Sequence, residues 1–133
     1  RDIIGCLNHW VAGWVDWNMV LDRQGGPNWF KNWCIAPVIV DPEQDEVYFT
    51  PLYDVMCHFS KFIRPGASVL ANDCADNDVM AVATENEDGS FTVVCFNQGD
   101  TPRSVHIEGL PDDVRIKLDA QALQTIVLTP YDL

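Results

Sequence analysis

The sequence Gly-Trp-Val-Asp-Trp-Asn at residues 13–18, followed by Gly-Gly-Pro-Asn at residues 25–28, decides the fold. Residues 11–18 form a short apolar run that ends in polar and aromatic side chains. A buried parallel strand has this composition, because both of its faces are covered. Residues 22–36 contain the Gly-Gly-Pro-Asn turn signal and are predicted to form a long ordered loop. The segment therefore predicts a buried strand that presents polar groups at its carboxyl end.

Helical patterns flank this strand and loop on both sides. Residues 1–9 predict the end of a helix, since Ile3, Ile4 and Leu7 share one face. A second helix is predicted over residues 51–63, with Thr50 as its N-cap and a proline in its first turn. Its apolar stripe comprises Leu52, Val55, Met56, Phe59 and Phe62, and Pro65-Gly66 ends it.

The remaining sequence predicts β-structure. Short alternating stretches are separated by turn residues, and Asp88-Gly89 between two of them indicates a hairpin. The predicted strands cover residues 79–83, 91–96, 104–108, 114–118 and 123–128, with a weaker one over 69–72. Five or six such strands suggest an antiparallel β-sandwich. The expected fold class is α+β: residues 1–65 form the last β/α unit of a (β/α)8 barrel, and residues 66–133 form the sandwich. One barrel unit cannot bury its own strand, so the remainder of the barrel is expected upstream.

Composition excludes several classes of protein. The 133 residues carry a net charge of −12, which argues against a nucleic-acid partner, because phosphate binding needs Lys and Arg. No apolar run reaches the length of a transmembrane segment, and the first residues do not resemble a targeting signal. The five cysteines are odd in number, widely spaced and without a Cys-x-x-Cys pair, so we expect neither a metal site nor a disulfide framework. No cofactor is expected.

Candidate functional residues lie where the predicted strand ends. Active sites of (β/α) barrels sit at the carboxyl ends of the strands, which is where Asp16, Trp17 and Asn18 fall. Sugar sites need a flat apolar platform with directional hydrogen bonds, and tryptophan supplies both. We expect Trp14 and Trp29 to be packing residues. Asp16 is expected to be a buried, hydrogen-bonded anchor.

These stretches, together with Leu21 and Asn32, resemble the eighth barrel strand and following loop of glycoside hydrolase family 30, in its glucosylceramidase-like branch. The resemblance continues through residues 37–41 and 58–66 and covers nearly the whole chain. It implies a retaining β-glucosidase with two catalytic glutamates, at the ends of barrel strands four and seven. Both strands would precede residue 1. The resemblance therefore implies that this chain holds no catalytic residue and is inactive alone.

The glutamates that the chain does contain are expected at the surface, and its three histidines are expected to be structural. The glutamates are Glu43, Glu46, Glu85, Glu87 and Glu108. The resemblance instead assigns substrate contact to Trp17 and Asn32, and makes Trp33 a wall for the aglycone. It gives Asp16 and Asn18 a supporting role behind the pocket. For Asn32 and Trp33 the alternative is a loop that only packs on itself.

The resemblance implies hydrolysis of glucosylceramide or a related β-glucoside, and a secreted or lysosomal setting. Another family 30 activity, on β-1,6-glucan or xylan, is the second enzyme hypothesis. A non-catalytic sugar-binding or structural sandwich is the hypothesis from a different class, but the strands offer few aromatic side chains for a sugar platform. Two glutamates at upstream strand ends would decide for the enzyme.

Overall fold

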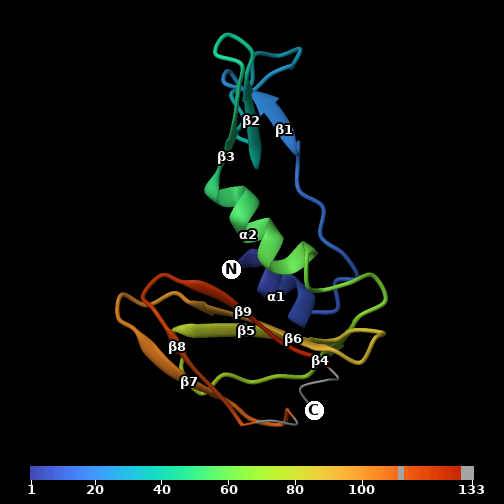
Figure 1. The fold of residues 1–133 in the computed structure, drawn as a ribbon, viewed down its shortest axis with the longest axis vertical. Coiled ribbons are helices and arrows are strands. Elements are labelled where there is room, and N and C mark those ends of the chain that lie inside the picture. Colours follow the sequence, from blue (N-terminus) through green and yellow to red (C-terminus); the bar gives the residue numbers. More distant parts are fainter. Residues whose placement is uncertain (111–112, 130–133) are drawn as a thin grey trace. The chain divides into compact units, whose positions relative to one another are not determined.

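The computed structural model describes residues 1–110 and 113–129. The chain divides into two compact units, one of residues 14–57 and one that joins residues 1–13 to the chain from His58 onward. Helix α2 (Pro51–Ser60) runs across this division. Each unit is a folded body of its own, with its own sheets (Figure 1). The boundary near residue 65 between barrel and sandwich stays a prediction.

The unit of residues 14–57 is built on a three-stranded sheet. Strand β1 (Val20–Asp22) pairs parallel with β2 (Val38–Asp41), which pairs antiparallel with β3 (Glu46–Phe49). Leu21 lies opposite Ile39, and Leu21 and Val38 are buried. The sequence did predict the loop that joins β1 to β2. The β2–β3 hairpin was not predicted, because its four-residue strands are too short to show a periodicity.

The buried strand predicted over residues 11–18 is wrong. These residues are exposed and form no strand, and β1 begins only at Val20. A parallel strand needs neighbours that accept and donate its backbone hydrogen bonds. Within the described residues, no strand pairs with this stretch. Its apolar composition therefore has nothing to pack against, and Val15 is left almost fully exposed.

Both helices form where the sequence predicts them. Helix α1 (Asp2–Asn8) buries Ile3 and Ile4. Helix α2 begins at Pro51, as expected, and ends at Ser60, three residues before the predicted end. After it, the buried amide of Asn86 donates to the carbonyl of Phe62 at 3.0 Å and accepts from the backbone N–H of Arg64 at 3.0 Å. Asn86 thus fixes the turn that follows the helix.

The other unit is an antiparallel sandwich, as predicted (Figure 1). One sheet has the order β4-β5-β6-β9, and the second sheet pairs β7 with β8. The sequence located five of these strands to within two residues and placed the weak strand β4 one residue late. The strands are β4 (Ser68–Leu70), β5 (Val79–Glu85), β6 (Phe91–Asn97), β7 (Arg103–Ile107), β8 (Val114–Leu118) and β9 (Leu123–Leu128).

The sandwich core follows from the alternation of side chains along each strand. Val93 and Cys95 of β6 face the β7–β8 sheet and form a cluster with Val79 and Leu118. The intervening Val94 is also fully buried, opposite Val82 of β5. On the helix side, His58 of α2 bonds Thr125 of β9 through its Nδ1 at 2.8 Å. Both faces of β6 are therefore covered, which explains its nearly continuous apolar sequence.

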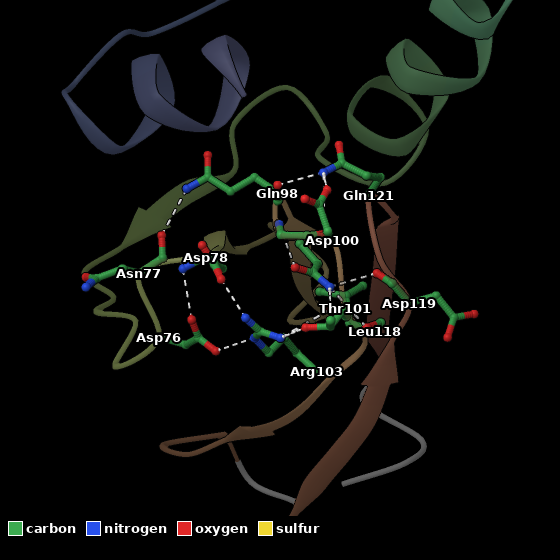
Figure 2. Close-up of polar contacts among 12 residues, drawn as sticks. Asp76, Asn77, Asp78, Gln98, Asp100, Thr101, Arg103, Leu118, Asp119 and Gln121 are labelled. Atoms are coloured by element: carbon green, nitrogen blue, oxygen red, sulfur yellow. Dashed lines mark hydrogen bonds and ion pairs between the residues drawn. The ribbon is translucent and has the colours of Figure 1, made fainter.

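An ionic contact ties the β4–β5 connection to the second sheet. Figure 2 shows Arg103, at the start of β7, between Asp76 and Asp78. Its Nε lies 2.8 Å from Asp76 and its Nη2 lies 2.5 Å from Asp78. The backbone N–H of Asp78 and, after it, the Arg103 guanidinium hold the pKa of Asp76 below its usual value. Arg103 therefore neutralises part of an acidic loop and orders it.

The cysteines form no disulfide: all five are free. Cys95 is buried, and burial, with a smaller effect from Cys74, raises its pKa to about 11. The other four are half-buried.

Replacing Asn97 with alanine is expected to destabilise the sandwich by about 3 kcal/mol. Its amide is fully buried, donates to the carbonyls of Thr101 at 2.8 Å and Asp119 at 2.9 Å, and accepts from the backbone N–H of Gly99 at 3.0 Å. Alanine would leave these backbone groups unpaired in the core. Urea unfolding of the full-length protein measures the loss, with Asn77→Ala as an exposed asparagine control. Equal midpoints for the two variants would contradict the prediction.

Candidate functional site

The candidate site is the loop that joins β1 to β2, and a tight turn opens it. The carboxylate of Asp22 accepts from the backbone N–H groups of Gln24 and Gly26, both at 2.8 Å. The backbone N–H of Asp22 donates to the Gly26 carbonyl at 2.7 Å. Gly25 has φ +74°, and a Cβ there would lie 2.4 Å from the backbone nitrogen of Cys34. Only glycine allows the two ends of the loop to approach this closely.

The amide of Asn28 organises the rest of the loop. Its Nδ2 donates to the carbonyls of Gly25 and Asn32, both at 3.0 Å, and its Oδ1 accepts from the Asn32 backbone N–H at 3.1 Å. One side chain thus pairs with both backbone groups of Asn32. The sequence analysis identified Asn28 only as part of a turn. Its position directly after Gly-Gly-Pro is the signal that could have indicated this role, because asparagine side chains often bond nearby backbone groups in turns.

Asn32 and Trp33 lie in this ordered loop, as the sequence predicts. Trp33 is 77% exposed. It lines an open depression of about 710 Å³, together with Asp22, Arg23, Cys34, Ile35, Ile39 and Tyr48. The indole therefore offers a flat apolar face at the rim of a cavity that also holds polar groups, the combination that sugar binding requires.

Asp16, Trp17 and Asn18 are not at a strand end, since the predicted strand is absent. Trp17 is 79% exposed, and its backbone N–H donates to the carboxylate of Asp16 at 2.8 Å. Asp16 is exposed, so it is not a buried anchor within this chain. Trp29 is 100% exposed and therefore does not pack within this chain either. Of the site residues that the sequence predicts, Trp33 lines the depression, and Asn32 precedes it in the loop.

A buried carboxylate that sequence reasoning missed supports the depression. Asp41, at the end of β2, is almost fully buried, and its Oδ2 lies 2.9 Å from Nη1 of Arg23. Its other oxygen accepts from the backbone N–H groups of Glu43 and Gln44. Burial raises the pKa of Asp41, but these hydrogen bonds outweigh it, and the pKa lies below its usual value. Asp41 is therefore charged at neutral pH and holds Arg23 at the rim.

The glutamates and histidines of the chain lie at the surface or in structural contacts. All five glutamates are exposed, as predicted. The histidines make structural contacts: His9 with the Gly5 carbonyl, His58 with Thr125, and His106 with Asp113. The part of the chain that the structure describes holds no group of three or more His, Cys, Asp or Glu side chains placed to bind a metal ion. Neither helix of residues 1–110 and 113–129 has the length and apolar composition needed to cross a membrane.

Several curated proteins are similar in sequence to most of this chain. A putative glucosylceramidase 4 of Caenorhabditis elegans is 42% identical over 102 residues, 75% of this chain and 20% of that protein. The lysosomal acid glucosylceramidase of Mus musculus is 40% identical over 108 residues, 79% of this chain and 21% of that protein. An endo-1,6-beta-D-glucanase of Trichoderma harzianum is 29% identical over 110 residues, 78% of this chain and 22% of that protein. The chain spans about a fifth of the length of these curated relatives.

The structural and family comparisons agree. The crystal structure of SrfJ from Salmonella typhimurium matches with a TM-score of 0.92 and 28% identity, covering 96% of this chain and 29% of that one. The model of the glycosyl hydrolase family 30 TIM-barrel domain matches residues 1–63. The model of the family 30 beta sandwich domain matches residues 67–126. The chain therefore belongs to glycosyl hydrolase family 30 and joins the end of its TIM barrel to its β-sandwich.

Proposed function

We propose that this chain is the carboxyl-terminal portion of a retaining β-glucosidase that hydrolyses the glucosidic bond of glucosylceramide. The observation that carries the proposal is the ordered loop after β1, which exposes Trp33 at an open depression while Asn28 holds the backbone of Asn32, the residue before Trp33. An exposed indole can stack on a sugar or shield an aglycone, and an asparagine amide can bond sugar hydroxyls. Higher identity to the two glucosylceramidases, at 42% and 40%, than to the β-1,6-glucanase, at 29%, supports the substrate.

In this proposal Trp17, Asn32 and Trp33 contact the substrate, and Asp16 and Asn18 support the pocket. The chemistry belongs to two glutamates in the remainder of the barrel, about 5–5.5 Å apart, one acting as acid/base and the other as nucleophile. Residues 1–65 complete that barrel, and residues 66–133 form the sandwich domain attached to it. Similarity to the lysosomal mouse enzyme supports a lysosomal or secreted setting.

Substrate choice tests the proposal in the full-length enzyme. We expect glucosylceramide to be hydrolysed with a kcat/KM well above that for β-1,6-glucan or xylan, and β-glucose to be the first anomer released. The anomer is read by proton NMR within the first minutes, before mutarotation. Preferred hydrolysis of the glucan would establish the second enzyme hypothesis. Hydrolysis of none of the three would leave the non-catalytic sandwich as the better explanation.

A further inference from the structure

We propose that Asn28 is a positioning residue, which holds Asn32 and Trp33 in the arrangement in which they meet the substrate. The inference rests on the proposed function for its kinetic consequence, although the contacts themselves do not depend on it. Asn28 does not line the depression. It acts through its hydrogen bonds to the backbone of Asn32.

The Asn28 amide bonds the Asn32 backbone at two points. Its Oδ1 accepts from the Asn32 backbone N–H at 3.1 Å, while its Nδ2 donates to the Asn32 carbonyl at 3.0 Å. These two bonds fix both the position and the orientation of the residue that precedes Trp33. The second Nδ2 hydrogen reaches the Gly25 carbonyl at 3.0 Å, so all three bonds are made by one short side chain.

The turn that the Asn28 amide bonds is itself anchored on the sheet of β1 and β2. Gly25 lies against the backbone of Cys34, and the turn that contains it is closed by Asp22, the last residue of β1. A contiguous set of contacts thus runs from the β1–β2 sheet through Asp22, Gly25 and Asn28 to Asn32. Rigid support of this kind holds a binding group within the small tolerance that recognition requires.

Asn28 also maintains the backbone conformation of Lys31. Lys31, between Asn28 and Asn32, has φ +54°, a left-handed conformation that side chains other than glycine rarely adopt. Released from Asn28, this residue is free to return to a more populated conformation. Asn32 would then shift and Trp33 would leave the depression, because both follow Lys31 directly in the chain.

Asparagine is needed because the site uses a donor and an acceptor on one side chain. Aspartate has the same shape but lacks both Nδ2 hydrogens, so Asn28→Asp removes the bonds to Gly25 and to the Asn32 carbonyl. Asn28 is itself exposed, so its loss costs little of the free energy of unfolding. A positioning role and a stabilising role therefore predict different outcomes for the same variant.

The test compares Asn28→Asp with Asn77→Asp, the same change at an exposed asparagine of the sandwich. In the full-length enzyme, Asn28→Asp should lower kcat/KM about tenfold, mainly through a higher KM, while the melting temperature stays near that of the wild type. Asn77→Asp should change neither quantity. On a Trp33→Ala background, Asn28→Asp should add less than its effect alone, because both act through one segment.

Hydrogen exchange gives a readout that needs no substrate. Faster exchange of residues 28–34 in Asn28→Asp, with the sandwich unchanged, is expected. If residues 28–34 of Asn28→Asp exchanged at the wild-type rate, the inference would be overturned. It would also be overturned if Asn28→Asp had the kinetics of the wild type, or if its effect added fully to that of Trp33→Ala. If the wild-type enzyme preferred β-1,6-glucan, the proposed substrate would be corrected. The kinetics of Asn28→Asp would then be measured with that glucan.

Discussion

The purified chain of residues 1–133 is expected to release no glucose from an aryl β-glucoside or from glucosylceramide. Retaining hydrolysis needs two carboxyl groups about 5–5.5 Å apart, one of them with a raised pKa so that it can act as the acid. The five glutamates of this chain are all exposed and lie on separate turns, strands and loops. None shares a pocket with Trp33. Loss of the whole rate enhancement makes this the largest effect that we predict.

The assay measures released glucose over hours at high protein concentration, with the full-length enzyme run in parallel as the positive control. Circular dichroism with a β-rich spectrum shows that the chain used in the assay is folded. Turnover clearly above the buffer blank would contradict the prediction if Glu46→Gln or another glutamate variant abolished it. A turnover that survives all five glutamate variants would indicate a contaminating glucosidase.

Replacing Trp17 with phenylalanine in the full-length enzyme is expected to lower kcat/KM about ten- to hundredfold. Phenylalanine keeps most of the apolar surface but lacks the indole N–H. If that N–H donates to a sugar hydroxyl in a dry pocket, its loss costs roughly 1–3 kcal/mol of transition-state binding. A packing role predicts the opposite order, because a core tryptophan cut to phenylalanine leaves a void and lowers the melting temperature first.

Trp29→Phe is the matched control, since it makes the same change at a fully exposed tryptophan of the same unit. Catalytic efficiency and melting temperature are measured for both variants. Near-normal efficiency of Trp17→Phe with a clear drop in melting temperature would assign Trp17 to packing. Equal losses of efficiency for both variants would mean that the effect is not specific to a sugar contact at Trp17.

Local patterns in the sequence were sufficient for most of the secondary structure. Helix α1 and the alternating strands β5 to β9 bury side chains within one unit, so the sequence shows the periodicity of the buried face, whereas Phe59 is the only member of the α2 stripe that is buried. The loop from residue 22 to 36 was predicted for a similar reason, because Gly-Gly-Pro-Asn favours turn conformations locally. The candidate residues Asn32 and Trp33 were located through the resemblance to family 30, and their contact with substrate stays a prediction.

Tertiary structure decided what depends on a partner distant in sequence. Residues 11–18 have the composition of a buried strand, yet a strand exists only where another strand pairs with it, and within the described residues none does. Asp41 gives no local signal of burial, because its charge is tolerated only through Arg23 and two backbone N–H groups. Asn28 bonds the backbone of Asn32, only four residues away, at 3.1 Å, across a left-handed Lys31 that its residue type does not predict. The sequence by itself determined the family, both helices and the sandwich strands, whereas the hydrogen bonds that hold the candidate site form only in the folded backbone.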